Sequence, residues 1–154
     1  MGLDMYLSAK RYVSKYFDEQ DAERADIIKS VFPELSDIDE LDGDLVKEVT
    51  VRVGYWRKAN AIHKWFVDNV QDGVDECQDS YVSREDLQNL KTACEAVLAD
   101  KEAAPYAPPT QSGFFFGDTS YDELYFKDIE DTIKIIDNAL KLPESWDFEY
   151  HSSW

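Results

Sequence analysis

Hydrophobic and polar residues alternate along three stretches of the chain, which is the pattern of half-buried β-strands. The first stretch covers residues 3–8 and extends toward Tyr12 and Val13, the second covers residues 49–53, and the third covers residues 146–151. The second is the clearest, because a β-branched valine occupies every other position. We expect the first two strands to pair antiparallel and the third to extend the same sheet.

Four other stretches carry apolar residues at helical spacing, which predicts amphipathic helices. They cover residues 22–32, about 57–70, 83–98 and about 121–140. A serine with an acidic residue three positions later, as in a capping box, stands at the start of the last two helices, and a proline follows the first and the last. The pattern therefore predicts an α+β fold, in which about four helices pack on a small antiparallel sheet of about three strands.

Length and composition set the class of protein. The chain has 154 residues, and we expect residues 1–154 to form a single domain. With 44% hydrophobic and 14% aromatic residues, the composition excludes a disordered acidic chain. Cys77 and Cys94 do not form a C-x-x-C pair, which predicts reduced thiols in a cytoplasmic protein. The sequence shows neither a signal peptide nor an apolar run of membrane-spanning length, so we expect no membrane association.

Charge narrows the functions further. The net charge of −17 argues against direct binding of nucleic acid, which needs clustered Lys and Arg, and allows an acidic surface that engages a basic protein. The candidate surfaces are two acidic stretches, residues 34–48 and 68–79. The spacing of acids in the first does not match an EF-hand, so a solvated loop is favoured over a calcium site. The residues that we expect to contact the partner lie in this first stretch: Asp37, Asp39, Glu40, Asp42 and Asp44.

One stretch has the opposite charge. Residues 49–66 carry four Lys or Arg and no Asp or Glu, and they join a predicted strand to a predicted helix. Backbone N–H groups at the start of a helix attract anions, so this junction is a candidate anion site. Its candidate ligand-binding side chains are Trp56, Arg57, Lys58, Asn60 and His63. The competing interpretation is that the bases pair with acids of the chain and that the histidine is a hydrogen-bonded structural residue.

A run of three phenylalanines between two glycines, residues 113–117, precedes the last predicted helix. Aromatic side chains beside a helix N-terminus suit a planar ligand with a negative group, such as a nucleotide. If this segment packs against the basic stretch, Phe115, Tyr121 and Asp122 complete a ligand pocket. The competing interpretation is that the phenylalanines fill the core.

Catalytic, metal and cofactor motifs are not found in the sequence. His63 has no second His or Cys at helical spacing, as a zinc pair would need, and no nucleophile is placed beside it. The glycine patterns of phosphate-binding and dinucleotide-binding loops are also absent. We therefore predict no catalytic residue, no metal and no cofactor, and we favour a non-enzymatic protein.

Three segments resemble a group of small, functionally uncharacterised acidic proteins of bacteria and their phages. The segments are residues 1–7 (MGLDMYL), residues 55–60 with His63 (YWRKAN-x-x-H), and residues 112–117 followed by 121–123 (SGFFFG and YDE). The resemblance implies no particular activity. It does imply a phage or mobile-element setting, in which small acidic proteins often inhibit host proteins that handle nucleic acid or act in defence.

Two hypotheses of different kinds follow. The first is a binding protein, such as a phage-type inhibitor, that presents carboxylates to the basic surface of a host protein. The second is a pocket protein, either an enzyme or a ligand sponge, that binds a nucleotide-like anion. Carboxylates spread over one face would favour the first hypothesis. Convergence of residues 56–63 with residues 113–122 on a cleft would favour the second.

Overall fold

The computed structural model describes residues 2–13, 26–27, 30–31, 34, 48–100 and 123–154. Contacts divide the chain into a larger unit, Met1–Ala9 with Arg52–Trp154, and a smaller unit, Lys10–Val51. The expectation that the whole chain forms a single domain stays a prediction. No helix among the described residues is both long and apolar enough to cross a membrane.

The described strands form one antiparallel sheet. They are β1 (Asp4–Tyr12), β2 (Glu48–Arg57), β3 (Ser80–Val82) and β4 (Asp147–Ser153), in the order β2-β1-β4-β3. The predicted antiparallel pairing of the first two strands is confirmed, and so is the strand near the end of the chain. The expected number of about three strands is too small, because β3 lies in a segment predicted to be a loop. Its three residues are too few to show an alternating pattern.

The helices that the structure describes in full are α2 (Asn60–Asn69), α3 (Arg84–Ala99) and α4 (Glu123–Ala139), so the described part has three where about four were expected. The capping box at the start of α3 is confirmed, since the Ser83 hydroxyl accepts from the Asp86 N–H and the Asp86 carboxylate accepts from the Ser83 N–H. The serine predicted to begin the last helix lies outside the described residues. Most of the first predicted helix, residues 22–32, lies outside them too.

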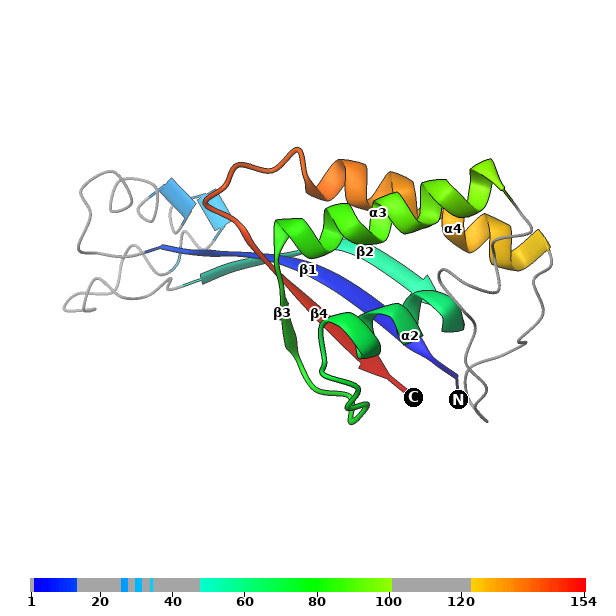
Figure 1. Ribbon diagram of the computed structural model, residues 1–154. Helices are drawn as coiled ribbons and strands as arrows, with labels where there is room; N and C mark the ends of the chain where they lie inside the picture. Colours follow the sequence, from blue (N-terminus) through cyan, green and yellow to red (C-terminus); the bar gives the residue numbers. More distant parts are fainter. Residues whose placement is uncertain (1, 14–25, 28–29, 32–33, 35–47, 101–122) are drawn as a thin grey trace. The chain divides into compact units, whose positions relative to one another are not determined.

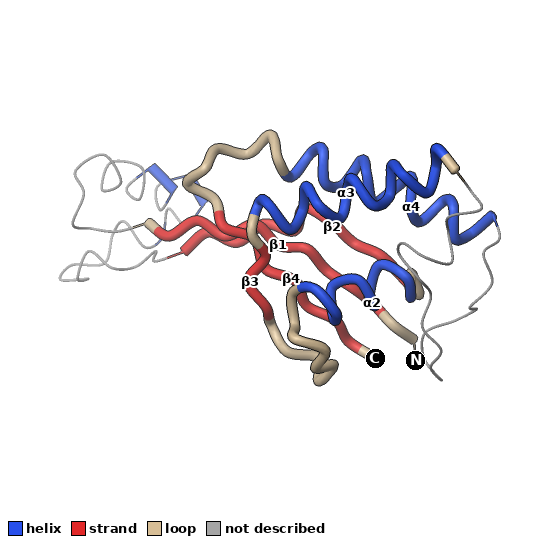
Figure 2. The backbone as a smooth tube through the Cα atoms, in the orientation of Figure 1, coloured by secondary structure: helices blue, strands red, loops and turns tan. Residues whose placement is uncertain are grey.

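The three helices lie on one face of the sheet (Figures 1 and 2). Along β1, Met5, Leu7 and Ala9 are buried on that face, while the residues between them are only partly buried. Phe148 and Tyr150 of β4 continue the buried layer. The helices complete the core with residues that have no exposed surface: Ile62, Phe66, Leu87, Leu90, Cys94, Val97, Ile129 and Ile136. We call this side of the sheet the covered face.

Gly54 of β2 sets how closely α4 approaches the sheet. A Cβ atom at this position would lie 2.5 Å from the Cγ2 of Ile135 on α4 and 3.2 Å from the Cβ of Leu7 on β1. Only a residue without a side chain therefore permits this packing. Next to it, the indole Nε1 of Trp56 donates a hydrogen bond of 2.8 Å to the Thr132 hydroxyl of α4. This bond fixes α4 on β2.

Of the smaller unit, the structure describes the ends of β1 and β2 and a few helical residues. Lys10 Nζ lies 4.0 Å from Glu48 Oε1, and the Thr50 hydroxyl donates to the same carboxylate over 2.9 Å. Ser30 donates to the Asp26 carbonyl, as expected within a helix. The acidic stretch predicted to contact a partner belongs to this unit, and its residues 35–47 lie outside the described part.

Candidate functional site

The basic stretch does not begin a helix where the sequence pattern placed it. β2 continues to Arg57, and α2 begins only at Asn60. Between them Lys58 has a left-handed backbone with φ of 58°, and its N–H donates to the Leu3 carbonyl over 2.8 Å. Arg57 and Lys58 are therefore exposed residues at the end of a strand and not part of the first turn of the helix. The prediction missed this because the strand continues through Tyr55 and Trp56, beyond the alternating valines.

The predicted ligand-binding residues lie on different sides of the backbone. Trp56 and Asn60 are each 4% exposed and belong to the interior, whereas the adjacent Arg57 is exposed. Side chains of neighbouring strand residues point to opposite faces, so Trp56 and Arg57 do not line a common pocket. The remaining members of the predicted pocket, Phe115, Tyr121 and Asp122, lie outside the described residues. The pocket as a whole stays a prediction.

His63 is the centre of a buried hydrogen-bond chain. Its Nδ1 lies 2.7 Å from the Tyr150 hydroxyl of β4, and its Nε2 lies 3.0 Å from Oδ2 of Asp75. The second oxygen of Asp75 accepts a hydrogen bond of 3.1 Å from the indole of Trp154. Because a carboxylate only accepts, the Nε2 of His63 carries a proton and donates it to Asp75.

The hydrogen-bonded groups of Asp75, His63 and Tyr150 are linked like those of a catalytic triad, but a substrate cannot reach them. His63 and Tyr150 are both 0% exposed, so no substrate can touch the imidazole or the phenol in this conformation. Burial raises the pKa of Tyr150 well above its usual 10.0, and the nearby Asp75 carboxylate raises it further. A phenol with a raised pKa stays protonated at neutral pH, so it supplies no phenolate nucleophile or base. The ring of Phe66 stacks on Tyr150 with centroids 4.0 Å apart. We therefore assign these hydrogen bonds a structural role: they join α2 and the loop after it to β4.

The opposite side of the sheet, which we call the open face, carries a row of rings. Tyr55 of β2 and Tyr6 of β1 have ring centroids 5.5 Å apart, and the Tyr6 ring stacks on His151 of β4 at 6.2 Å. The Arg52 guanidinium lies 4.3 Å from the centre of the Tyr6 ring. Tyr81 of β3 pairs with a β4 residue on the same side. In the larger unit no described helix lies on this face (Figure 1).

The polar groups of the open face bind one another and leave the rings accessible. The Tyr55 hydroxyl donates to the Asp4 carboxylate over 2.5 Å, and this hydrogen bond raises the pKa of Tyr55. His151 Nδ1 lies 2.9 Å from Oδ1 of Asp79, beside β3. Tyr55 is nevertheless 46% exposed and Tyr81 is 66% exposed. Exposed tyrosines beside an arginine are typical of protein-binding surfaces.

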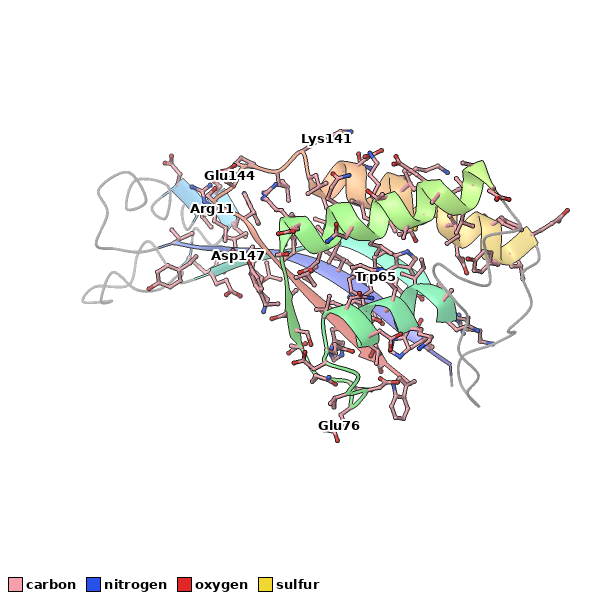
Figure 3. All side chains as sticks on the ribbon, viewed as in Figure 1. Arg11, Trp65, Glu76, Lys141, Glu144 and Asp147 are labelled. Carbon is pink, nitrogen blue, oxygen red and sulfur yellow. The ribbon has the colours of Figure 1, made fainter. Side chains whose placement is uncertain are left out.

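An acidic loop borders this face. Residues 68–79, the end of α2 and the loop that follows it, carry five Asp or Glu and no Lys or Arg, and all of them are described. Three of these carboxylates are engaged, by Lys64, His63 and His151, whereas Asp72 and Glu76 are exposed. Glu76 lies at the tip of the loop and points away from the sheet (Figure 3). The five acids predicted from the other stretch, Asp37, Asp39, Glu40, Asp42 and Asp44, lie outside the described residues.

The residues of the open face occupy the positions between the apolar residues of the predicted strands. Asp4, Tyr6, Glu149 and His151 occupy the non-core positions of two correctly predicted strands. Alternation places these residues opposite the apolar face, but it does not show which strands are neighbours, so the row across the strands is not visible in the sequence. No sequence pattern indicates that Asp75 bonds His63, because the two residues are 12 positions apart across a loop.

Among the described residues, no group of three or more His, Cys, Asp and Glu side chains is arranged to hold a metal ion. Comparisons with protein-family models, with curated proteins and with solved structures found no match for this chain.

Proposed function

We propose that this protein is a binding protein that docks the open face of its sheet, with the acidic loop beside it, against a basic protein surface. The observation that carries the proposal is the row formed by Tyr55, Tyr6 and His151 across three strands, with Tyr81 on the fourth strand. A sheet face normally buries its aromatic side chains against another layer. Here the layer that would cover them is absent among the described residues of the larger unit, which makes a partner protein the natural cover.

Charge selects the kind of partner. The chain carries a net charge of −17, and the loop of residues 68–79 adds exposed carboxylates at the edge of the open face. Such a potential attracts a basic surface and raises its association rate, while it repels nucleic acid. The tyrosine rings then supply the apolar contact that long-range charge attraction lacks.

A basic groove that normally holds nucleic acid is the partner that fits both features. Carboxylates stand in for phosphates, and tyrosine rings stand in for bases, which themselves stack on aromatic or guanidinium groups. The protein would thus act as an inhibitor of a host nucleic-acid-handling or defence protein. The resemblance of three segments to proteins of bacteria and phages supports this setting by association.

Competition against DNA tests the proposal. A fluorescent DNA duplex bound to an oligoarginine peptide serves as the probe, and the full-length protein is added as competitor at several salt concentrations. We expect displacement that weakens steeply as salt rises, because charge pairing is screened. The variant Tyr6→Ser/Tyr55→Ser should require at least about tenfold more protein, because aromatic anchors dominate interface energies.

A matched variant separates this face from the rest of the surface. Leu124→Ser also removes an exposed apolar side chain without changing the charge, on α4 and away from the proposed surface. It should stay within about twofold of the wild type. Equal losses for the two variants, or no loss for the tyrosine variant, would contradict docking through the open face. Thermal unfolding of each variant shows that the fold is retained.

A further inference from the structure

A cleft of about 270 Å³ lies beside the edge strand β3, where the segment after α4 leads into β4. Tyr81 and Trp146 contribute its aromatic walls, Glu144 and Asp147 its carboxylates, and Arg84 its one guanidinium. Tyr81 belongs to the open face, so the cleft continues that surface at its β3 edge. Glu144 and Asp147 both project from the segment that enters β4 (Figure 3).

The guanidinium of Arg84 is already used within the fold. Its Nη2 donates to the carbonyls of Leu142 and Pro143 over 2.9 and 2.6 Å, and it lies 5.3 Å from the Phe148 ring. Carbonyl groups after a helix carry partial negative charge, which a cation satisfies. Arg84 thus holds the segment after α4 in place, and its hydrogen bonds are directed into the protein rather than toward a ligand.

Unlike Arg84, the carboxylates of Glu144 and Asp147 are not used in bonds within the described part of the fold. Glu144 and Asp147 are exposed, and no described residue forms an ion pair or hydrogen bond with either side chain. Most other carboxylates of the described surface have a partner, such as Asp137 with Lys91 and Asp131 with Lys134. Among the described residues, Glu144 and Asp147 are therefore two unpaired acids that line a cleft with aromatic walls.

A carboxylate pair beside aromatic rings selects a cation. Carboxylates accept charge-assisted hydrogen bonds, and the faces of Trp and Tyr attract a cation through the ring quadrupole. An anion would meet two carboxylates, and a neutral apolar group would desolvate both of them without compensation. We propose that the cleft binds the head of a lysine or arginine side chain of the basic partner, between the carboxylates and the rings of Tyr81 and Trp146.

This inference rests on the proposed function and names the part of the partner that the β3 edge recognises. Two small ligands test it directly: Nα-acetyl-arginine methylamide, and its citrulline analogue, which has nearly the same shape and no charge. Titration of the isotope-labelled wild-type protein should move the indole N–H signal of Trp146 with the arginine ligand and leave it unmoved with citrulline. The variant Trp146→Phe assigns that signal.

The variant Glu144→Gln/Asp147→Asn should weaken binding of the arginine ligand by at least about tenfold, since both charge-assisted bonds are lost. Glu95→Gln/Glu130→Gln removes the same number of charges elsewhere on α3 and α4 and should change binding less than about twofold. All four carboxylates lie on exposed residues, so both variants should fold. Equal weakening by the two variants, equal binding of citrulline, or no response of Trp146 would overturn the inference.

The outcomes of the two proposals are distinguishable in the DNA competition assay. If the tyrosine variant of the open face loses competition and the cleft variant does not, the cleft inference fails and the proposed function stands. If the cleft variant loses competition and the tyrosine variant does not, docking through the open face fails, and the basic partner is recognised at the β3 edge.

Discussion

Both faces of the sheet carry tyrosine and histidine, but these residues are buried on one face and accessible on the other. On the covered face, a tyrosine and a histidine, Tyr150 and His63, are fully buried and bonded to each other. On the open face, Tyr6 and His151 stack as rings, and the histidine pairs with an acid at the edge. The covered pair cannot be reached by a ligand, whereas the open row can. Residue type alone therefore does not determine whether a tyrosine or histidine is accessible, because that depends on whether helices cover its face of the sheet.

The largest expected effect separates the two histidines. His63→Ala should lower the free energy of unfolding by about 3–5 kcal/mol, because it opens a cavity and leaves Asp75 and the Tyr150 hydroxyl without their partner. His151→Ala should cost less than about 1 kcal/mol, since the side chains of His151 and Asp79 are 39% and 64% exposed. Urea unfolding of both variants measures the difference. Similar losses would show that the two faces do not differ in this way.

The next effect concerns alkaline pH and the covered face. Burial raises the pKa of Cys94 from its ordinary 9.0 to about 12. The unfolded state loses this proton first, so the thiol's contribution is complete below pH 9 and is lost as pH rises toward 12, by at most about 4 kcal/mol.

The variant Cys94→Ala isolates that contribution from the ionisation of the tyrosines. Its free energy of unfolding should fall less steeply between pH 9 and 12 than that of the wild type. Identical slopes would mean that this thiol does not titrate differently in the folded and unfolded states. Cys77 is partly exposed, so a thiol reagent should modify it in the native protein while Cys94 stays protected.

A smaller effect tests how closely α4 packs on the covered face. Gly54→Ala places a methyl group against Ile135 of α4 and should cost about 1–3 kcal/mol through overpacking. Adding Ile135→Ala removes the opposing atom, so the double variant should be more stable than the sum of the single changes predicts. Thermal unfolding of the three variants gives the coupling. Strict additivity would mean that α4 does not press on β2 at this position.

The smallest effect concerns the residue that the sequence pattern placed in a ligand pocket. Arg57 is exposed at the end of β2, so Arg57→Ala should change the free energy of unfolding by less than about 0.5 kcal/mol. A loss of several kcal/mol would instead indicate a buried charge pair. A screen for stabilisation by nucleotides, followed by thermal unfolding, tests the pocket hypothesis in the same samples.

Periodicity predicted the strands and helices that have a long one-sided pattern. Three of the four described strands follow directly from local sequence, and so does the capping box at Ser83. The short strand β3 escaped, because it is defined by its pairing with β4 rather than by its own residues. The start of α2 was placed too early, since the left-handed turn at Lys58 has no glycine or asparagine to announce it.

The candidate site was harder to predict than the fold. The row on the open face depends on the strand order β2-β1-β4-β3, and the contact between Gly54 and Ile135 joins residues far apart in sequence. His63 drew attention as the histidine of a basic stretch, but its partners Asp75 and Tyr150 are brought to it only by tertiary structure. Side chains that act together from different strands leave no spacing rule in the sequence.

The tyrosine rings themselves test the central claim most directly. The ring signals of Tyr6, Tyr55 and Tyr81 report on the open face, and those of Tyr125 and Tyr150 report on the core. Titration of the isotope-labelled wild-type protein with an oligoarginine peptide should move the first three and leave the last two unchanged. If the open-face rings stay unmoved while the signals of residues 34–48 shift, the partner binds through the acidic stretch and not through the open face.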